Sequence, residues 1–319
     1  MSRHLVHPEL LPFLDAMPAR PPMDAENLAE RRAFVFPRPP LTPEQESVKR
    51  TEMTVPGPEG APDVRILLYE PADRGLSARP GYVHIHGGGF VLGTPDMSDG
   101  ANRNLVLKFG CTIASVDYRL APENPAPAGI EDCYAVLAWM HANAAELGVD
   151  PKRIAVGGES AGGGLAANLA ILARDRGEYP VCFQYLDCPM LDDRTCLNEN
   201  PHPLVGEFIW DLANNSFGWG ALLGTDPGLP GVPDYAVAAR CGDLAGLPPT
   251  FIAVGTLDLF LEEDMEYARR LIRAGVPTEL HLITGAYHGF NASGADTAPT
   301  RKHTYLRTSF MAAHWGVQG

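Results

Sequence analysis

From about residue 51 onward, the chain alternates short apolar runs with longer amphipathic stretches. The runs have the β-branched and aromatic content of strands and are bounded by turn residues. They are TEMTV (51–55), DVRILLYE (63–70), GYVHIH (81–86), CTIASVDY (111–118), RIAVGG (153–158), VCFQYLD (181–187), TFIAVGT (250–256) and TELHLIT (278–284). The later runs are apolar on both faces and are separated by helical stretches long enough for a crossover. This pattern predicts an α/β fold with a mostly parallel eight-stranded sheet and helices on both faces.

Two parts of the chain lack this strand pattern. Residues 1–50 are rich in proline and charge, and the stretch TPEQ at 42–45 matches a helix start with a capping box. Residues 190–249 contain clusters of proline, glycine and aromatic residues and little strand alternation. We therefore predict an N-terminal helical cap segment over 1–50 and an α/β domain over 51–319, which contains a second cap insertion at 190–249.

Composition and charge narrow the class of protein. With 45% hydrophobic and 20% charged residues among 319, the chain has an ordinary globular composition. Its net charge of −14 argues against nucleic acid or an anionic membrane as a partner, because phosphate groups are bound by clustered Lys and Arg. There is no apolar signal segment at the N-terminus and no uninterrupted stretch of 18 apolar residues. The six cysteines lack CxxC spacing and are expected to be free thiols, so we expect a soluble cytoplasmic protein.

The hexapeptide GGESAG, residues 157–162, joins a predicted strand to a predicted helix at Ser160. A nucleophilic serine needs such a sharp turn between small residues, because the turn exposes its hydroxyl above the sheet. Gly158 and Gly162 remove the Cβ atoms that would clash in the turn. The same letters also occur in ordinary glycine-rich loops, so this motif alone leaves both interpretations open.

A second glycine motif, HGGGF at 86–90, directly follows another predicted strand. Consecutive glycines offer free backbone N–H groups and let a substrate carbonyl approach closely, as an oxyanion hole requires. A flexible turn or a phosphate-binding loop are the alternatives. Phosphate binding fits poorly, because no Lys-Ser/Thr pair follows and the spacing is not GxGxxG.

Together, HGGGF, DYRLAPENPAPAG (117–129) and GGESAGGGLAANLA (157–170) resemble the hormone-sensitive-lipase-like family of α/β-hydrolases. The resemblance implies a hydrolase fold, carboxylesterase activity without a cofactor, and an acid and a histidine that follow the serine in that order. Asp258 and His288 each come after a predicted strand and match this order. One departure is visible, since Asp258 is followed by LFLEE where similar proteins often carry Asp-Pro-Leu and then Asp-Glu.

The resemblance implies a role for each of these residues. Ser160 is the expected nucleophile, His288 the general base, and Asp258 the acid that orients the imidazole. The expected oxyanion donors are the backbone N–H groups of Gly88, Gly89 and Ala161. No metal site is expected, because Asp192 and Asp193 have no third ligand nearby in the sequence.

Other chemically interesting residues have less specific interpretations. His84 and His281 lie within strand patterns and are expected to be ordinary sheet residues, while His86 is expected to order the glycine loop. Glu159 could tune the charge beside Ser160, bind a polar substrate group or form a structural hydrogen bond. The aromatic residues of the insertion line a substrate pocket or form the small core of a lid, and the sequence does not decide between the two. They are Phe208, Trp210, Phe217 and Trp219.

The sequence therefore predicts a serine carboxylesterase that hydrolyses short- to medium-chain esters through an acyl-enzyme, with the chain length implied by the family. A lactonase, amidase or arylesterase acting on a specific polar substrate would use the same residues. A small-molecule receptor of the same fold is a further alternative, although such receptors typically lack one member of the triad. Relatives commonly pair through an edge strand, which makes the strand at 278–284 a candidate for a homodimer interface.

Overall fold

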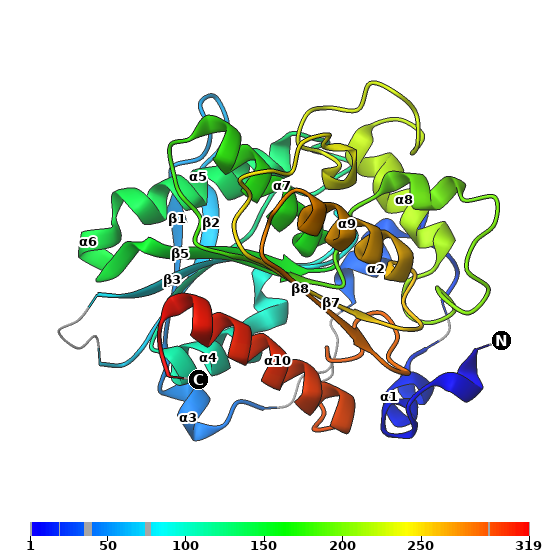
Figure 1. Ribbon diagram of the computed structural model, residues 1–319, viewed down its shortest axis with the longest axis horizontal. Helices are drawn as coiled ribbons and strands as arrows, with labels where there is room; N and C mark the ends of the chain where they lie inside the picture. The colour runs from blue at the N-terminus through cyan, green and yellow to red at the C-terminus, as the bar shows by residue number, and fades with distance from the viewer. Residues whose placement is uncertain (1, 19, 35–39, 74–77, 293, 319) are drawn as a thin grey trace.

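One eight-stranded sheet forms the centre of the computed structural model, which describes residues 2–18, 20–34, 40–73, 78–292 and 294–318 (Figure 1). The strands are β1 (Lys49–Val55), β2 (Val64–Glu70), β3 (Arg79–Ile85), β4 (Thr112–Val116), β5 (Val149–Glu159), β6 (Gln184–Asp187), β7 (Thr250–Gly255) and β8 (Thr278–Ile283). Their order across the sheet is β1-β2-β4-β3-β5-β6-β7-β8. β2 runs antiparallel to both of its neighbours, and every other pair is parallel. The predicted mostly parallel eight-stranded sheet is therefore confirmed.

Helices cover both faces of this sheet. The α-helices are α1 (Leu11–Ala16), α2 (Leu28–Ala33), α3 (Pro43–Glu46), α4 (Asp99–Phe109), α5 (Ala128–Ala142), α6 (Ala144–Leu147), α7 (Ala161–Arg176), α8 (Leu212–Leu223), α9 (Leu261–Arg273) and α10 (Ala298–Trp315). Short 3-10 turns add η1 (Arg3–Leu5), η2 (Pro8–Leu10), η3 (Pro95–Ser98), η4 (Asp193–Leu197) and η5 (Ala238–Arg240). Figure 1 shows α5, α7 and α9 on one face and α4 and α10 on the other.

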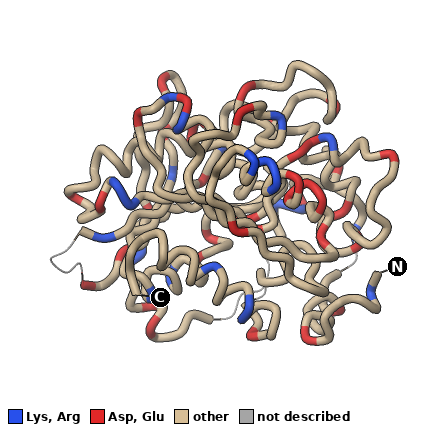
Figure 2. Tube along the Cα trace, in the orientation of Figure 1, with Lys and Arg blue, Asp and Glu red and all other residues tan. Residues whose placement is uncertain are grey.

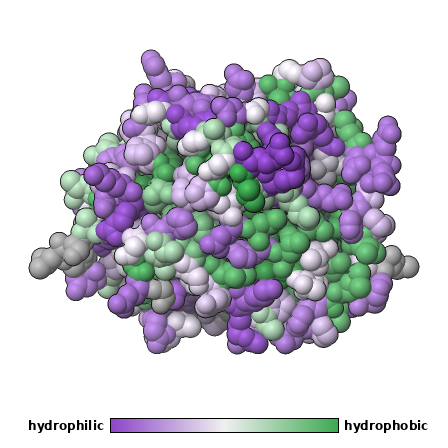
Figure 3. Space-filling view, in the orientation of Figure 1, coloured by the Kyte–Doolittle hydropathy of each residue, from purple (hydrophilic) through white to green (hydrophobic). Residues whose placement is uncertain are grey.

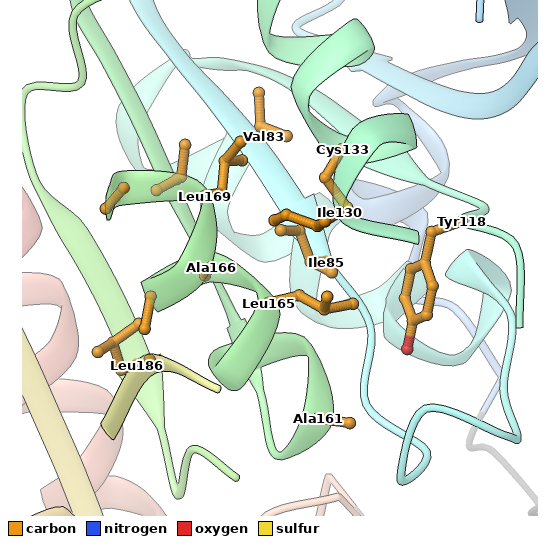
Figure 4. Packing of buried hydrophobic residues seen from close by; sticks show 14 of the residues in the cluster. Val83, Ile85, Tyr118, Ile130, Cys133, Ala161, Leu165, Ala166, Leu169 and Leu186 are labelled. Carbon is orange, nitrogen blue, oxygen red and sulfur yellow. The ribbon is translucent and has the colours of Figure 1, made fainter. Parts of the chain in front are cut away.

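The alternation of side chains along each strand gives the sheet two hydrophobic cores. On β3, Val83 and Ile85 point into the core beneath α5 and α7, whereas Tyr82 belongs to the core beneath α4 and α10. Figure 4 shows Leu165 and Leu169 of α7 facing these two β3 residues. Burial on both faces fixes the register of the central strands, and with it the positions of the loops at their carboxyl ends.

Several predicted strand bounds differ from the observed ones by a few residues, and at β6 the difference has a local reason. β6 begins at Gln184 and not at residue 181, because Pro248 and Pro249 precede the partner strand β7 and have no N–H to extend the ladder. One of the helical stretches between the strands forms two helices, α5 and α6, which meet at Asn143, whose amide donates to the Trp139 carbonyl at 2.8 Å. The capping box at Thr42 and Gln45 is present as predicted.

The surface carries charges of both signs. Figure 2 shows Lys and Arg scattered among Asp and Glu along the trace. Within the described part of the chain, no helix combines the length and the apolar character needed to cross a bilayer. The six cysteines are all free thiols, as expected.

Candidate functional site

Ser160 occupies a sharp turn between β5 and α7. Its φ of 56° and ψ of −122° lie outside the conformations that L-residues ordinarily adopt, so the turn holds this serine under strain. A Cβ added to Gly158 or Gly162 would lie 2.1 Å from the Ile85 carbonyl oxygen in either case. Both glycines are therefore required, because the turn packs directly against the end of β3.

The structure brings together the three residues that the sequence singled out at separate strand ends. His288 Nε2 lies 2.9 Å from Ser160 Oγ, and His288 Nδ1 lies 2.8 Å from Asp258 Oδ2. The side chains come from the loops after β5, β7 and β8, which are 98 and 30 residues apart in the chain (258 − 160 and 288 − 258). These contacts form an unbroken hydrogen-bond chain from hydroxyl to imidazole to carboxylate.

This hydrogen-bond chain is almost fully shielded from solvent. Ser160 is 8% exposed, His288 5% and Asp258 1%. The second carboxylate oxygen of Asp258 accepts the Phe260 N–H at 3.0 Å, which fixes the orientation of the carboxyl group. The Phe260 ring also stands edge-on to the imidazole, with their centroids 5.1 Å apart. Low solvent access strengthens the electrostatic interactions between the three groups.

The glycine loop lies directly beside Ser160. A Cβ on Gly87 would be 3.3 Å from the Ser160 Cβ, so the two turns are in close contact. Among the described residues, the N–H groups of Gly88 and Gly89 have no hydrogen-bond acceptor. Ala161 is the first residue of α7, where a backbone N–H has no partner within its own helix. The positive end of the helix dipole adds to the attraction for negative charge here.

His86 helps to order the glycine loop, as the sequence indicated. Its Nδ1 lies 2.8 Å from the Gly87 carbonyl, and its ring stacks on Tyr118 with centroids 4.4 Å apart. Burial lowers the pKa of His86 to about 4, so this imidazole is neutral at physiological pH. A neutral, stacked ring in this position is a scaffold for the loop.

Glu159 and the two strand histidines form hydrogen bonds with groups other than Ser160 Oγ. Glu159 Oε2 pairs with His84 Nε2 at 3.1 Å, and His84 Nδ1 contacts Ser115 Oγ at 2.7 Å. His281 pairs with Glu279 on the edge strand. Of the interpretations left open for Glu159, the structure therefore supports the structural hydrogen bond.

The four aromatic residues of the insertion divide between core and site. Trp219 packs on Phe90 inside the core, Phe217 packs partly buried against the same core, and Phe208 stands edge-on to Tyr287. Trp210 instead lies across the glycine loop. Its Cη2 is 2.1 Å from the position that a Cβ on Gly89 would occupy, and its ring centroid is 6.3 Å from that of His288.

A strained turn holds Trp210 in this position. Ile209 has a φ of 65°, which is unusual for a β-branched residue, and the Trp210 N–H donates to the Phe208 carbonyl at 2.7 Å in a γ-turn. The indole Nε1 donates to Asn215 Oδ1 at 3.1 Å. Two hydrogen bonds and a strained backbone thus fix the indole beside the catalytic candidates.

One group near the site has donor atoms spaced as in a metal centre. Candidate ligand atoms of Cys188, Asp258 and His288 all lie within 4.8 Å of one another. Burial raises the pKa of the Cys188 thiol well above its usual value, and a protonated thiol is a poor ligand. Asp258 and His288 are already hydrogen-bonded to each other, so these residues fit an acid and base pair better than a metal site.

Asp192 and Asp193 form hydrogen bonds and ion pairs within the insertion at 190–249. Asp193 accepts hydrogen bonds from Arg240 and from the Gly228 N–H, whereas Asp192 pairs with Arg194. Each carboxylate thus has a protein partner within residues 190–249.

Sequence reasoning missed a polar cluster below the nucleophile. Asp187, Asn291 and His303 come together from β6, the loop after β8 and α10. No motif marks them, and they are separated by 104 and 12 residues in the chain. The cluster could therefore be found only from the folded structure.

The chain is similar to known proteins over most of its length. The sequence profile that describes the α/β hydrolase fold matches residues 82–292. The chain is 37% identical over 289 residues to Esterase LipI of Mycobacterium tuberculosis, which corresponds to 89% of this chain and 88% of that protein. It is 36% identical over 296 residues to Carboxylesterase NlhH of the same organism, with 91% and 90% covered. In three dimensions it is similar to Bacterial Heroin Esterase, with a TM-score of 0.88, 36% identity and 99% of both chains covered.

Proposed function

Because the chain belongs to the hormone-sensitive-lipase-like family of α/β-hydrolases and is a carboxylic ester hydrolase, we propose that Ser160 is its nucleophile, His288 its general base and Asp258 the orienting acid. The observation that carries this proposal is the hydrogen-bond chain Ser160 Oγ, His288 Nε2, His288 Nδ1 and Asp258 Oδ2, with contacts of 2.9 and 2.8 Å. The alternatives of a specific polar-substrate hydrolase or a receptor are not favoured, since these relatives are named esterases.

The reaction proceeds in two halves. In the first, Ser160 Oγ attacks the ester carbonyl carbon while its proton passes to His288 Nε2. The carbonyl oxygen becomes an oxyanion that accepts the N–H groups of Gly88, Gly89 and Ala161, each of which contributes about 3 kcal/mol to lowering the barrier. Collapse of this intermediate expels the alcohol, which takes the proton from His288, and leaves an acyl group on Ser160.

In the second half, His288 removes a proton from water as the water oxygen attacks the acyl carbon. A second oxyanion forms in the same place and collapses, the Ser160–acyl bond breaks, and the proton returns to Ser160 Oγ. The carboxylic acid is released and the enzyme is regenerated. Throughout, the Asp258 carboxylate stabilises the imidazolium and holds its Nδ1–H in place.

We further propose a preference for short- to medium-chain acyl groups. The support is the position of Trp210, whose indole is fixed against Gly89 and faces His288, so that it borders the space in which the substrate carbonyl must lie. A large rigid ring at this distance limits the volume open to the substrate. Replacing Trp210 by Ala is expected to raise kcat/KM for long acyl chains relative to butyrate.

A phosphonate ester probe tests the catalytic assignment. The purified protein is treated with the probe, and the modified peptide is identified by mass spectrometry while hydrolysis of a butyrate ester is followed in parallel. A single adduct on Ser160 is expected, together with loss of adduct and hydrolysis in Ser160→Ala. The control is Ser47→Ala, which removes an exposed hydroxyl far along the chain at the end of α3. Full hydrolysis by Ser160→Ala would overturn the proposal.

The division of the chain into a catalytic domain and caps is part of the same proposal. Residues 1–50 and 190–249 contribute helices and loops and no strand except the start of β1 at Lys49 among the described residues. The two segments are in contact with each other. Ser2 Oγ donates to Glu207 at 2.8 Å, and the Met23 N–H donates to Asn214 at 2.8 Å, which joins the two segments to each other.

We also propose that two copies pair through β8. This strand is an edge of the sheet, Leu282 on it is 38% exposed, and Figure 3 shows hydrophobic residues gathered over this part of the molecule. Light scattering coupled to size exclusion is expected to give twice the chain mass of 34.4 kDa, and a mass near 34.4 kDa would contradict the pairing. A cytoplasmic location is proposed on the strength of the six free thiols, which suit a reducing compartment.

A further inference from the structure

The loop that carries His288 contains no helix or strand among its described residues. It connects β8 to α10, and its described residues, 284–292 and 294–297, form turns and irregular structure. At its beginning it is held by the N-terminal segment, because the His7 N–H donates to the Gly285 carbonyl at 3.0 Å and Tyr287 Oη donates to the Leu10 carbonyl at 3.1 Å. These bonds lie before His288 in the chain, so a second attachment is needed to fix the loop beyond it.

His303 on α10 supplies that second attachment. Asn291 Nδ2 lies 3.3 Å from His303 Nδ1, and the Phe290 ring stands edge-on to the imidazole with centroids 5.7 Å apart. His303 is only 1% exposed. Two residues that closely follow His288 therefore rest on one buried side chain of the last helix.

Asp187 completes the cluster and links it to the nucleophile. Its Oδ1 lies 3.0 Å from His303 Nε2, and its Oδ2 accepts Asn291 Nδ2–H at 3.0 Å. The backbone carbonyl of the same residue accepts the Ser160 N–H at 2.8 Å. A single residue at the end of β6 thus bonds to the strained turn with its main chain and to the His288 loop with its side chain.

The hydrogen bonds of this cluster assign a role to each ring nitrogen of His303. Asn291 presents its amide nitrogen to His303 Nδ1, which must accept, and His303 then donates from Nε2 to Asp187. Burial acts to raise the pKa of the Asp187 carboxyl, but the neighbouring His303, Asn291 and Arg307 outweigh it and hold the pKa below its ordinary value. The Tyr185 hydroxyl, 3.3 Å from His303 Nε2, is the remaining polar neighbour. The Asp187 carboxyl group is therefore ionised, and each of its two oxygens has a hydrogen-bond partner.

We propose that Asp187, Asn291 and His303 are positioning residues that hold the His288 imidazole in line with Ser160 Oγ. The inference deepens the proposed function and rests on it. The cluster fixes the distance between Ser160 Oγ and His288 Nε2 from both sides, because Asp187 bonds to the turn of Ser160 and to the loop of His288. None of the three touches the reacting atoms, so their loss displaces the base without removing it. A displacement of about 1 Å between reacting groups costs roughly 100-fold in rate.

The test compares variants of the full chain in hydrolysis of a butyrate ester. Asn291→Ala detaches the loop and leaves the contact between His303 and Asp187 in place, so it disturbs the fold least. His303→Ala removes the contact of the imidazole with Asn291 and its contact with Asp187. His303→Gln restores an amide donor toward Asp187. The control is His314→Ala on the same helix, which removes a bond from the imidazole to the Phe310 carbonyl and the ring contacts with Phe183 and Phe310, all of them away from the loop of His288. Circular dichroism and thermal unfolding establish that each variant is folded.

In Asn291→Ala and His303→Ala, kcat is expected to fall roughly 10- to 100-fold while KM changes less than about twofold, and phosphonylation of Ser160 is expected to slow by the same factor as kcat. His303→Gln is expected to recover part of kcat, and His314→Ala to match the wild type. The double variant is expected to lose less than the product of the single losses, since both changes break one attachment. If folded Asn291→Ala and His303→Ala keep kcat within twofold of the wild type, or if His314→Ala loses as much, the positioning role is wrong. Hydrolysis by Ser160→Ala would instead refute the catalytic assignment.

Discussion

Asp264 presents the sharpest case for a measurable effect of pH on stability. The residue lies in the first turn of α9 and is 0% exposed. Neither of its carboxyl oxygens has a hydrogen-bond partner among the described residues. Burial, and then the charges of Glu263, Asp258 and Asp187, raise its pKa well above the ordinary value. The helix dipole favours the charged form here by at most about 2 kcal/mol, which is less than the cost of burying an unpaired carboxylate.

The sign of the effect follows from the proton balance. Below the pKa of an unfolded aspartate, near 4, the folded and unfolded chains both carry the proton. Above it, the unfolded chain releases the proton and the folded chain keeps it, so the free energy of unfolding falls by about 1.4 kcal/mol per pH unit until Asp264 ionises in the fold. Asp264→Asn removes the ionisation and keeps the shape of the side chain.

Urea unfolding at pH 5, 6 and 7, followed by far-ultraviolet circular dichroism, measures this difference. Relative to the wild type, Asp264→Asn is expected to gain stability steadily as the pH rises. Glu263 is also buried, and burial raises its pKa to about 8, but it remains in both proteins and its contribution to the difference cancels. Glu262→Gln is the control, because it removes an exposed acid two residues earlier in the same first turn of α9. Parallel curves for Asp264→Asn and the wild type would refute the reasoning.

Three further changes have expected outcomes. Asp258→Asn should lower kcat by about 10³- to 10⁴-fold, because the amide favours the wrong tautomer of His288, and full activity in steady-state assays would exclude Asp258 as the acid. Gly89→Ala should lower kcat in the same assay, because the added Cβ would lie 2.1 Å from Trp210 Cη2 and the backbone φ of +60° disfavours alanine; wild-type rates would show that the loop can move aside. Thr42→Ala should cost about 1 kcal/mol in urea unfolding with kcat unchanged, since it removes the cap of α3, and an altered kcat would contradict a purely local role.

The fold and the turn at Ser160 could be predicted because their signals are local. A strand, small residues and a helix within about 20 residues describe the turn at Ser160, and the same kind of pattern repeats for the eight strands. The sequence could also order Asp258 and His288 after the right strands. It could not place Trp210, because residues 190–249 have no periodicity and the position of the indole depends on a strained γ-turn at Ile209. The cluster at His303 was beyond prediction for a related reason, since its partners meet only through tertiary packing.

The departure from the family pattern after Asp258 is explained by what the following acids contact. Glu262 is exposed, whereas Glu263 is buried and its Oε1 accepts the N–H groups of Leu191 and Asp192 at 2.7 and 3.2 Å. Glu263 therefore ties α9 to the start of the insertion and is not available to the imidazole. Among the acids that the structure describes, only Asp258 combines a contact to His288 Nδ1 with a second bond, from the Phe260 N–H, that fixes its carboxyl group. An acid that must hold an imidazole in one orientation needs this second bond, because a carboxylate free to rotate would not select the tautomer.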